Sequence, residues 1–273
     1  MSDTEKSAKT GPGIAESETA PPAPQEGMTH FGFRRVPTRE KATLVRNHFD
    51  AVAKTYDRMN TLLSFGIHYF WKRAAVGSLQ LKEGESVLDV CGGTGDLSVL
   101  AAKRIGPSGT VVLYDINRAM MEAGRSKSTH AAERRRILYV QGDAERAALA
   151  SGSFDAAMVG FGIRNLTNRE EGLREIHRVL KPGGRFVCLE FSQPTAGWFR
   201  FLYDFYSFHI MPILGRLFAG SQQAYTYLPE SIRLFPSPKE LSGVLEEIGF
   251  REVCYRRLTN GIACVHSGVK REQ

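Results

Sequence analysis

The apolar residues that follow residue 40 recur at helical spacing. They are Leu44, Phe49, Val52, Tyr56 and Met59, and a second apolar run extends from Leu63 to Trp71. Apolar positions three to four residues apart lie on one face of a helix. The pattern therefore predicts a helical cap on the N-terminal side of a larger domain.

From residue 86 onward, short apolar runs alternate with amphipathic segments. The predicted strands are 86–90, 110–115, 136–141, 154–161 and 185–191, and the predicted helices are 96–104, 118–128 and 169–180. The last of these helices ends at Lys181-Pro182-Gly183-Gly184, a strong helix breaker. Alternation of strand and helix at this spacing predicts an α/β fold with a doubly wound, mostly parallel sheet.

The end of the chain has a different pattern. Two further predicted strands, 250–258 and 262–267, flank Asn260-Gly261, a strong signal for a β-hairpin. The sheet should therefore have seven strands and finish with an antiparallel pair. This ending is unusual for a nicotinamide-binding domain and suits a methyltransferase.

Composition and charge narrow the class of protein. The 273 residues are 42% hydrophobic and 24% charged, which is typical of a globular protein and excludes a fibrous or wholly disordered chain. The net charge of +7 suits an anionic partner, but charge alone does not choose among nucleic acid, phospholipid and a phosphorylated ligand.

Residues 1–27 contain no aromatic side chain and are rich in Ser, Thr, Glu, Pro, Ala and Gly, so we expect a disordered tail.

Targeting signals and metal sites are not evident. The sequence has neither an apolar run of about 18 residues nor an apolar signal core at its start, so we expect a cytoplasmic protein that does not span a membrane. The four cysteines show no paired spacing and are read as core thiols. Histidines and cysteines lack the spacing of metal ligands, so no metal is expected.

The segment VLDVCGGTGDLSVLAA (87–102) is the most informative part of the chain. A buried strand enters a glycine-rich turn that includes Gly92 and Gly95, and a helix follows at once, so the backbone can approach a ligand closely. Carboxylates at Asp89 and Asp96 would repel a pyrophosphate. They suit a ligand that carries an amino group and no phosphate, such as S-adenosylmethionine.

Two later strand ends carry further acidic residues. Asp115 ends the next predicted strand, where a carboxylate can accept hydrogen bonds from both hydroxyls of a ribose. Asp143 and Ala144 close the third strand and could meet an adenine amino group. Taken alone, Asp143 is explained at least as well as an ordinary loop acid or a helix N-cap, but the order of the three strand ends favours the contact with the ligand.

Several motifs identify a family. They are THFGF, YDRMNTLLSFGIH, WKR, GGTGDL, DIN, GFGIRNLTN, EIHRVLKPGG, LEFSQP, YSFH, AYTYLPESIR and GIACVHSG. From about His30 to its end, the chain closely resembles the quinone-biosynthesis C-methyltransferases. These belong to the class I S-adenosylmethionine methyltransferases and methylate demethylmenaquinol and the 2-polyprenyl-6-methoxybenzoquinol precursor of ubiquinone. The resemblance implies a Rossmann-like methyltransferase domain at 28–273.

The resemblance also implies cofactor contacts and a division of the domain. The implied contacts to S-adenosylmethionine are Thr94, Asp115, Asp143, Ala144 and Gly160. The family often has a small polar residue at Gly160, so this chain would offer only backbone there, and RAALASGS replaces the family's usual Leu-Pro-Phe-Pro-like loop. The expected parts are a helical cap (28–82), a cofactor-binding core (83–192), an acceptor-site or lid insertion (193–235), and a C-terminal helix with the hairpin (236–273).

The chemistry of ring methylation indicates where the acceptor binds. A quinol becomes nucleophilic at carbon when an adjacent hydroxyl loses its proton, so the site needs a base or a group that stabilises the oxyanion. GFGIRN places Arg164 and Asn165 at the carboxyl edge of the sheet. Because arginine stays protonated, we expect Arg164 to be the electrostatic partner of the phenolate, and the resemblance likewise marks it as catalytic.

Residues of the cap and the insertion are further candidates. Tyr56 could contact the acceptor or the methionine end of the cofactor, and a packing tyrosine is an equal alternative. His68 and His209 could act as bases, but a structural role fits each of them better. The aromatic segment 198–218 suits either a lid or tunnel for a polyprenyl tail or a helix packed on the core.

The expected partners follow from the acceptor. A lipid-like quinol and a basic surface favour peripheral contact with the inner face of the cytoplasmic membrane, and a homodimer or a quinone-synthesis complex is compatible with the sequence. Two alternatives stay open, a methyltransferase for another small molecule or RNA, and a non-catalytic subunit that binds the cofactor. No nucleic acid partner is expected, because the chain has no Asn-Pro-Pro-Tyr-like motif.

Overall fold

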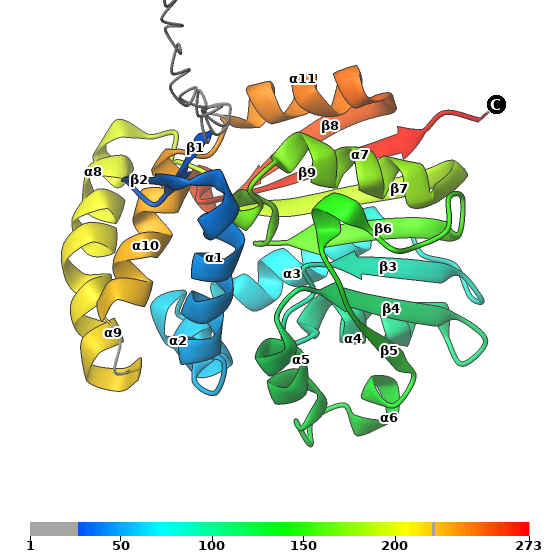
Figure 1. Ribbon diagram of the computed structural model, residues 1–273, viewed down its shortest axis with the longest axis horizontal. Helices are drawn as coiled ribbons and strands as arrows, with labels where there is room; N and C mark the ends of the chain where they lie inside the picture. The colour runs from blue at the N-terminus through cyan, green and yellow to red at the C-terminus, as the bar shows by residue number, and fades with distance from the viewer. Residues whose placement is uncertain (1–26, 220–221, 273) are drawn as a thin grey trace, which may run out of the picture.

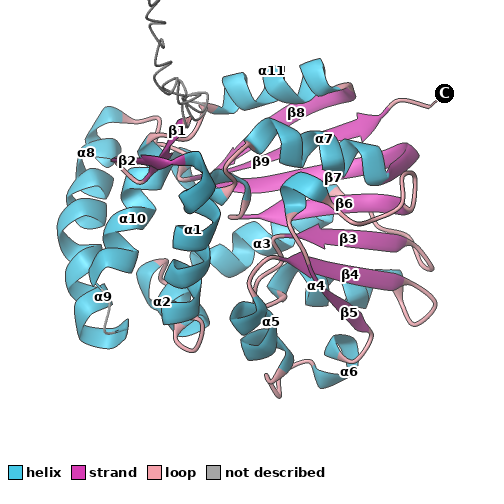
Figure 2. Cartoon of the chain, in the orientation of Figure 1, coloured by secondary structure: helices cyan, strands magenta, loops and turns pink. Residues whose placement is uncertain are grey.

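The computed structural model describes residues 27–219 and 222–272 (Figure 1). The predicted disordered tail therefore lies outside the described residues except for Gly27. A central sheet carries helices on both faces, and a group of helices stands beside one end of it (Figure 2). This arrangement confirms the predicted α/β class.

The central sheet has seven strands in the order β5-β4-β3-β6-β7-β9-β8. Their bounds are β3 Ser86–Val90, β4 Thr110–Asp115, β5 Ile137–Gln141, β6 Phe154–Gly160, β7 Leu180–Phe191, β8 Phe250–Leu258 and β9 Ala263–Lys270. Strand β9 is antiparallel to both of its neighbours, and the other strand pairs are parallel. The predicted seven-stranded sheet with a C-terminal antiparallel hairpin is confirmed.

The helices predicted at 96–104, 118–128 and 169–180 are present with shifted ends, among further helices of which those at 131–134 and 222–233 were not predicted. The α-helices of the described residues are α1 Thr38–Val52, α2 Tyr56–Leu63, α3 Ile67–Ser78, α4 Asp96–Ile105, α5 Arg118–Arg125, α6 Ala131–Arg134, α7 Arg169–Val179, α8 Gly197–Phe205, α9 Met211–Ala219, α10 Gln222–Arg233 and α11 Pro238–Ile248. Asn117, Asn168 and Ser237 cap α5, α7 and α11, because each side-chain oxygen accepts a hydrogen bond from a backbone N–H of the first turn.

The core lies on both faces of the sheet because successive strand residues point to opposite sides. Val87 of β3 packs in a cluster with Ala75 of α3 and Ala101 of α4. Its neighbour Leu88 packs in a second cluster with Ile176 of α7 and Leu241 of α11. Near-continuous apolar runs in the strands are the consequence of this double burial.

Two details differ from the sequence expectations. A small antiparallel hairpin, β1 Met28–Phe31 with β2 Arg34–Pro37, precedes the cap helices, and its polar, short strands gave no clear pattern. The strand predicted to begin at residue 185 begins at Leu180, because Leu180 pairs with Phe154 before a register shift at the Pro-Gly-Gly segment. Neither the hairpin nor residues 180–184 line the cavity described below, but Phe31 of β1 stacks on Tyr227 of its wall, with ring centres 4.4 Å apart.

The insertion between β7 and α11 is helical at residues 197–219 and 222–233. α8, a π-helical turn at Tyr206–Ile210 and α9 follow one another without a break. Figure 1 shows α8 and α9 at the outer edge of the molecule, with α10 and α1 between them and the sheet. The insertion and the N-terminal cap therefore stand together at the end of the sheet where the parallel strands finish.

Candidate active site

A cavity of about 460 Å³ lies between the carboxyl ends of the parallel strands and the helices of the cap and insertion. Its wall includes the loop after β3 at one end and residues of α8, such as Phe199 and Leu202, at the other. Its size is within the range of small-molecule sites, about 300 to 1,000 Å³. The parallel strand ends, where α/β folds bind their ligands, thus open into this cavity.

The glycine loop after β3 leaves room for a ligand at the wall. A Cβ atom added to Gly92 would lie 2.6 Å from Leu113, so a larger residue does not fit. Gly93 and Gly95 have positive φ values of 54° and 77°, and Cys91 shares this conformation at 53°. The loop then enters α4, whose N-terminal end faces the ligand space.

Asp115 organises the loop from the neighbouring strand. Its Oδ2 accepts a hydrogen bond from Gly93 N–H at 2.8 Å, and its Oδ1 accepts one from Asn117 N–H at 2.7 Å. Burial raises the pKa of Asp115 to about 6, although both hydrogen bonds favour the charged form. A carboxylate offers about four acceptor positions, so capacity remains for the two hydroxyls of a ribose.

The next strand ends contribute three more predicted residues. Asp143, Ala144 and Gly160 all line the cavity. Asp143 Oδ1 also accepts a hydrogen bond from Glu145 N–H at 2.9 Å, so it is the N-cap of a short 3-10 turn as well. Gly160 presents backbone to the cavity, and an added Cβ would lie 2.9 Å from Leu97 Cδ1.

Two predicted cofactor residues do not line the cavity, whereas Gly92 and Thr94 do. Asp89 is buried behind the loop, where its Oδ2 accepts a hydrogen bond from the Ser98 hydroxyl at 2.6 Å. Gly95 supplies the left-handed turn into α4. The structure therefore places Asp89 behind the glycine loop and Gly95 within the loop, where it forms the turn into α4.

Four charged side chains join the cap to this loop. Lys72 Nζ of α3 lies 2.7 Å from Asp96 Oδ2, Lys127 Nζ lies 3.1 Å from Asp96 Oδ1, and Lys127 also pairs with Asp57. Thr94 donates its hydroxyl hydrogen bond to Asp57 Oδ1 at 2.8 Å. Burial alone would raise the pKa of Asp96, but Lys72 and Lys127 outweigh it and hold this pKa below its usual range.

The sequence suggests that the Asp96 carboxylate is available to the amino group of a ligand, but in the structure this ion-pair cluster already engages it. Two lysines already pair with its carboxylate, and Arg134 Nη2 lies 3.8 Å away. The cluster brings both charge signs to the loop, as a zwitterionic amino-acid end of a ligand requires. Lys72 and Lys127 were missed because they lie on segments distant in sequence from the glycine motif.

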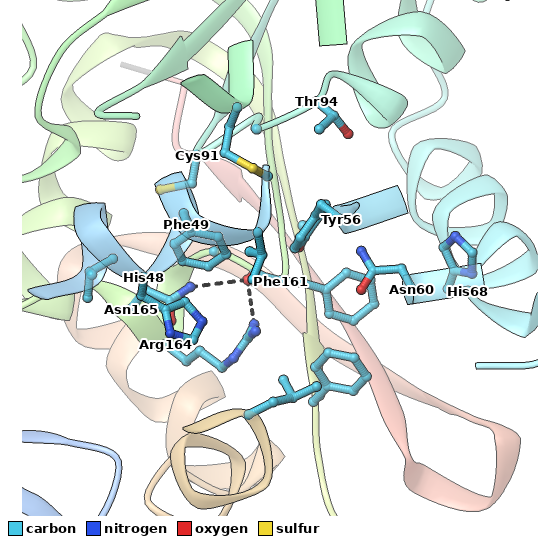
Figure 3. A pocket seen from close by; sticks show the side chains of 18 of the residues that line it. His48, Phe49, Tyr56, Asn60, His68, Cys91, Thr94, Phe161, Arg164 and Asn165 are labelled. Carbon is cyan, nitrogen blue, oxygen red and sulfur yellow. Dashed lines mark hydrogen bonds between the residues drawn. The ribbon is translucent and has the colours of Figure 1, made fainter. Parts of the chain in front are cut away.

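Arg164 lies at the other side of the cavity and is almost fully buried. Its Nη1 pairs with Glu190 Oε1 at 2.8 Å and also donates to the carbonyl of Phe161 (Figure 3). Burial alone would lower the pKa of Arg164, but Glu190 beside it raises this pKa, so the guanidinium stays charged. Nε of Arg164 has no hydrogen-bond partner among the described residues and is buried.

Asn165 lies beside Arg164 and is oriented from two sides. Its Nδ2 donates to Phe161 O at 3.5 Å, a long contact (Figure 3), and its Oδ1 accepts a hydrogen bond from Tyr227 OH at 2.9 Å. Phe161 has a left-handed φ of 58°, uncommon for a bulky residue, and its carbonyl accepts from both Arg164 Nη1 and Asn165 Nδ2. The strand end is thus shaped to hold Arg164 and Asn165 together.

Histidines and tyrosines complete the wall. His48 lines the cavity, and burial, followed by the charge of Arg164, lowers its pKa to about 4, so it is neutral near pH 7. Tyr56 lies between Thr94 and Phe161 in Figure 3, with its ring 6.0 Å from that of Phe49. Tyr56 therefore both packs and faces the cavity, in agreement with its two sequence interpretations.

The two histidines considered as bases lie in different places. His68 lines the cavity, and its Nδ1 lies 2.7 Å from the hydroxyl of Ser64, which itself donates to Asn60 O at 2.6 Å. His68 Nδ1 must therefore be the donor, and Nε2 is left as an unprotonated acceptor without a partner among the described residues. His209 is exposed and is not part of the cavity wall.

The residues present fit S-adenosylmethionine. A tight glycine cradle, a carboxylate with acceptor capacity at the end of β4 and a cluster of mixed charge match a nucleoside joined to an amino acid. Among residues 27–219 and 222–272, no group of three or more His, Cys, Asp and Glu side chains could hold a metal ion. The sheet order with one reversed strand and this site together define a class I S-adenosylmethionine methyltransferase.

Comparisons with known proteins agree. A solved Thermotoga maritima structure, described as a SAM-dependent methyltransferase and possible histamine N-methyltransferase, has a TM-score of 0.58 at 19% identity, over 83% of this chain and 100% of that one. The ubiquinone/menaquinone biosynthesis C-methyltransferase UbiE of Stenotrophomonas maltophilia (strain R551-3) is 47% identical, over 90% of this chain and 97% of that protein. The protein of the same name in Methylococcus capsulatus is 46% identical, over 90% and 99%.

The profile of the ubiE/COQ5 methyltransferase family matches residues 37–270. The chain therefore belongs to the ubiE/COQ5 methyltransferase family, as its motifs predict, and is an S-adenosylmethionine-dependent C-methyltransferase. The predicted fold, enzyme class and methyl donor are confirmed. Within the part of the chain that the structure describes, no helix is long and apolar enough to cross a membrane.

Proposed function

We propose that this enzyme adds a methyl group to a ring carbon of a prenylated quinol, in the synthesis of ubiquinone, menaquinone or both. The observation that carries this proposal is the continuity of one cavity from the glycine loop to the buried guanidinium of Arg164. The names of the relatives that share 46 to 47% of their residues with the chain support the same acceptor class.

The cofactor would be held by the residues around the glycine loop. Asp115 would accept hydrogen bonds from the ribose hydroxyls, and Asp143 with the backbone of Ala144 would meet the adenine. The contacts would be completed by Gly92, Thr94 and the backbone of Gly160. Asp89 would support the loop from behind, and Gly95 would form its turn into α4. When bound, S-adenosylmethionine supplies the electrophilic methyl group.

The acceptor would lie between Tyr56 and Arg164. The guanidinium of Arg164 stabilises the phenolate oxygen that forms when a ring hydroxyl releases its proton to water in the cavity. Its pairing with Glu190 and Phe161 fixes Nη1, and Nε is buried, so Nη2 is the nitrogen left to meet the oxygen, directly or through water. Asn165 orients the same oxygen, and Tyr56 covers the ring.

Water carries the protons of this reaction. The ring carbon beside the phenolate would form a carbon–carbon bond as the methyl–sulfur bond breaks and the sulfur leaves as a thioether. The proton on that carbon would then pass to a water molecule, which restores the aromatic ring. Neutral His48 and the apolar rings of Phe49 and Phe161 lower the polarity of the wall around the acceptor, which strengthens the electrostatic contribution of Arg164.

The domain division expected from sequence is compatible with this arrangement. Helices of the cap (28–82) and the insertion (193–235) enclose the acceptor end, and the core (83–192) holds the cofactor end. We further propose that the protein is cytoplasmic with peripheral contact to the inner face of the membrane, since its acceptor is a lipid. A homodimer or a quinone-synthesis complex stays compatible with the fold.

Mass spectrometry tests the proposal. Purified protein is incubated with S-adenosylmethionine and, in parallel, with reduced demethylmenaquinone and the demethylated ubiquinone precursor. We expect a gain of one methyl group on a ring carbon of at least one quinol. No transfer to either quinol, with cofactor binding intact, would contradict the proposed acceptor and favour a different small molecule or RNA.

A further inference from the structure

An apolar surface surrounds one entrance of the cavity. Among the residues that line the cavity, four are exposed to solvent: Arg46, Phe65, Ile67 and Leu202. Phe65 and Ile67 flank the turn between α2 and α3, and Leu202 lies on α8. Arg46 lies on α1, where its carbonyl accepts a hydrogen bond from Asn117 Nδ2 at 3.0 Å beside the cofactor residues. The cavity thus has a polar opening at the cofactor end and an apolar one at the acceptor end.

The apolar opening continues into a larger exposed surface, which we name the apolar rim. The rim consists of Phe65, Ile67, Trp198, Phe201, Leu202 and Phe205. Phe65 is 79% exposed, Trp198 70% and Phe201 73%. The α8 members follow the i, i+3, i+4, i+7 spacing of one helix face, and Phe65 meets the insertion through Tyr206, at 6.1 Å between ring centres. Contiguous exposed patches of this kind mark interaction sites.

The charges on these elements are suited to an anionic surface. Arg58 and Arg73 on the cap helices and Arg200 and Arg216 on the insertion are exposed. The acidic side chains of the same elements are engaged, because Asp57 pairs with Lys127 and Asp204 pairs with Arg233. The free charge beside the apolar rim is therefore basic, as in helices that lie at the interface of an anionic bilayer.

We propose that the apolar rim inserts into an anionic lipid bilayer and that the quinol enters the cavity directly from the membrane through this opening. The inference rests on the proposed function, since it assigns a route to the prenylated acceptor of the same site. A protein partner that covered the rim would close the entrance, whereas a fluid bilayer covers it and supplies the acceptor. The cofactor would exchange with water through the opening at Arg46.

Co-sedimentation with vesicles tests the surface without substrate or cofactor. We expect the wild type to bind vesicles of phosphatidylcholine with phosphatidylglycerol, and to bind pure phosphatidylcholine vesicles less. The double variant Trp198→Ser/Phe201→Ser, whose two residues belong to the apolar rim but do not line the cavity, should lose at least tenfold in vesicle affinity. Leu138→Ser is the matched control, because Leu138 is 55% exposed on the edge strand β5, and this variant should bind as the wild type does.

Two outcomes would overturn the proposal. One is equal vesicle binding by the rim variant and the wild type, or no binding by either. The other is a fall in molar mass of the rim variant, measured by light scattering, which would make the surface an interface between proteins.

Methyl transfer separates this proposal from the reaction itself. The rim variant should lose activity toward prenylated quinol in vesicles and keep the wild-type rate with a tail-less, water-soluble quinol, so loss of both would contradict the route proposed here.

Discussion

Arg164 Nη1 lies 2.8 Å from Glu190 Oε1, and both side chains are buried at the carboxyl edge of the sheet. Glu190 ends the buried part of β7, where its Oε2 also accepts a hydrogen bond from the backbone N–H of Arg164 at 3.3 Å. The guanidinium carbon lies 5.4 Å from the ring centre of Phe191. One carboxylate therefore fixes both the backbone and the side chain of Arg164, the residue proposed to face the acceptor.

Removal of Glu190 should reduce stability as well as activity. Glu190→Ala leaves the guanidinium buried without its counter-ion, and breaking a buried pair in this way costs about 3–5 kcal/mol of unfolding free energy. Urea unfolding at pH 7 measures this cost. Glu190→Gln keeps the hydrogen-bond acceptor and should lose less. An alanine variant as stable as the wild type would show that the pair contributes nothing to the fold.

Removal of Arg164 should affect turnover far more than cofactor binding. In Arg164→Ala the phenolate loses its charged partner, so kcat should fall about 100- to 1,000-fold, the usual effect of deleting one oxyanion donor. Calorimetric titration should give a dissociation constant for S-adenosylmethionine within about twofold of the wild type. If affinity falls as much as turnover, the role assigned to Arg164 is wrong.

Cofactor affinity should fall in mild acid. Burial raises the pKa of Asp115 to about 6, and ribose hydroxyls bind the ionised carboxylate. Protonation competes with binding, so affinity is full well above pH 6 and is lost as the pH falls through this value. We expect S-adenosylmethionine to bind about tenfold more weakly at pH 5 than at pH 8, because one pH unit below the pKa corresponds to about 1.4 kcal/mol.

Two variants assign this pH dependence to its residue. Asp115→Asn should bind weakly and equally at pH 5 and pH 8. Burial also raises the pKa of Asp89, to about 7, so Asp89 titrates in the same range. Asp89→Asn should nevertheless keep the wild-type pH dependence, because Asp89 lies behind the cavity wall. If the pH dependence disappears in Asp89→Asn, it arises from the titration of Asp89, which supports the glycine loop, and the assignment to Asp115 is wrong.

The fold and the cofactor end of the site could be predicted from sequence because their signals are local. The alternation of strand and helix, and the glycines between Asp89 and Asp96, lie within short windows where period and spacing decide the structure. Asp115 and Asp143 follow from the same rule, since parallel strands end at one edge of a sheet. Arg164 was found because it occupies the equivalent position after β6.

The remaining site residues depend on contacts between distant segments. Glu190 is 26 positions from Arg164, and Tyr227 reaches Asn165 across 62 positions. Lys127 meets Asp57 only because α2 folds back over the loop after α5. Neither periodicity nor spacing encodes these pairings. The position of Asp89 behind the loop is a local effect: side chains alternate in direction along β3, and Ser98 on α4, nine positions later, donates its hydroxyl hydrogen bond to Asp89.

Gly160→Ser should lower the stability of the protein through crowding and raise its affinity for S-adenosylmethionine through the added hydroxyl. A Cβ atom there would lie 2.9 Å from Leu97 Cδ1, so the Leu97 side chain must move, at a cost of about 1–3 kcal/mol in stability. The hydroxyl of Gly160→Ser faces the cofactor end of the cavity, and one added hydrogen bond contributes about 0.5–1.5 kcal/mol. We expect a lower Tm with a roughly two- to tenfold tighter S-adenosylmethionine complex. Gly160→Ala is the matched control, since it adds the same Cβ without the oxygen. It should lower the Tm equally and leave the affinity unimproved, whereas tightening by both variants would assign the effect to packing against Leu97.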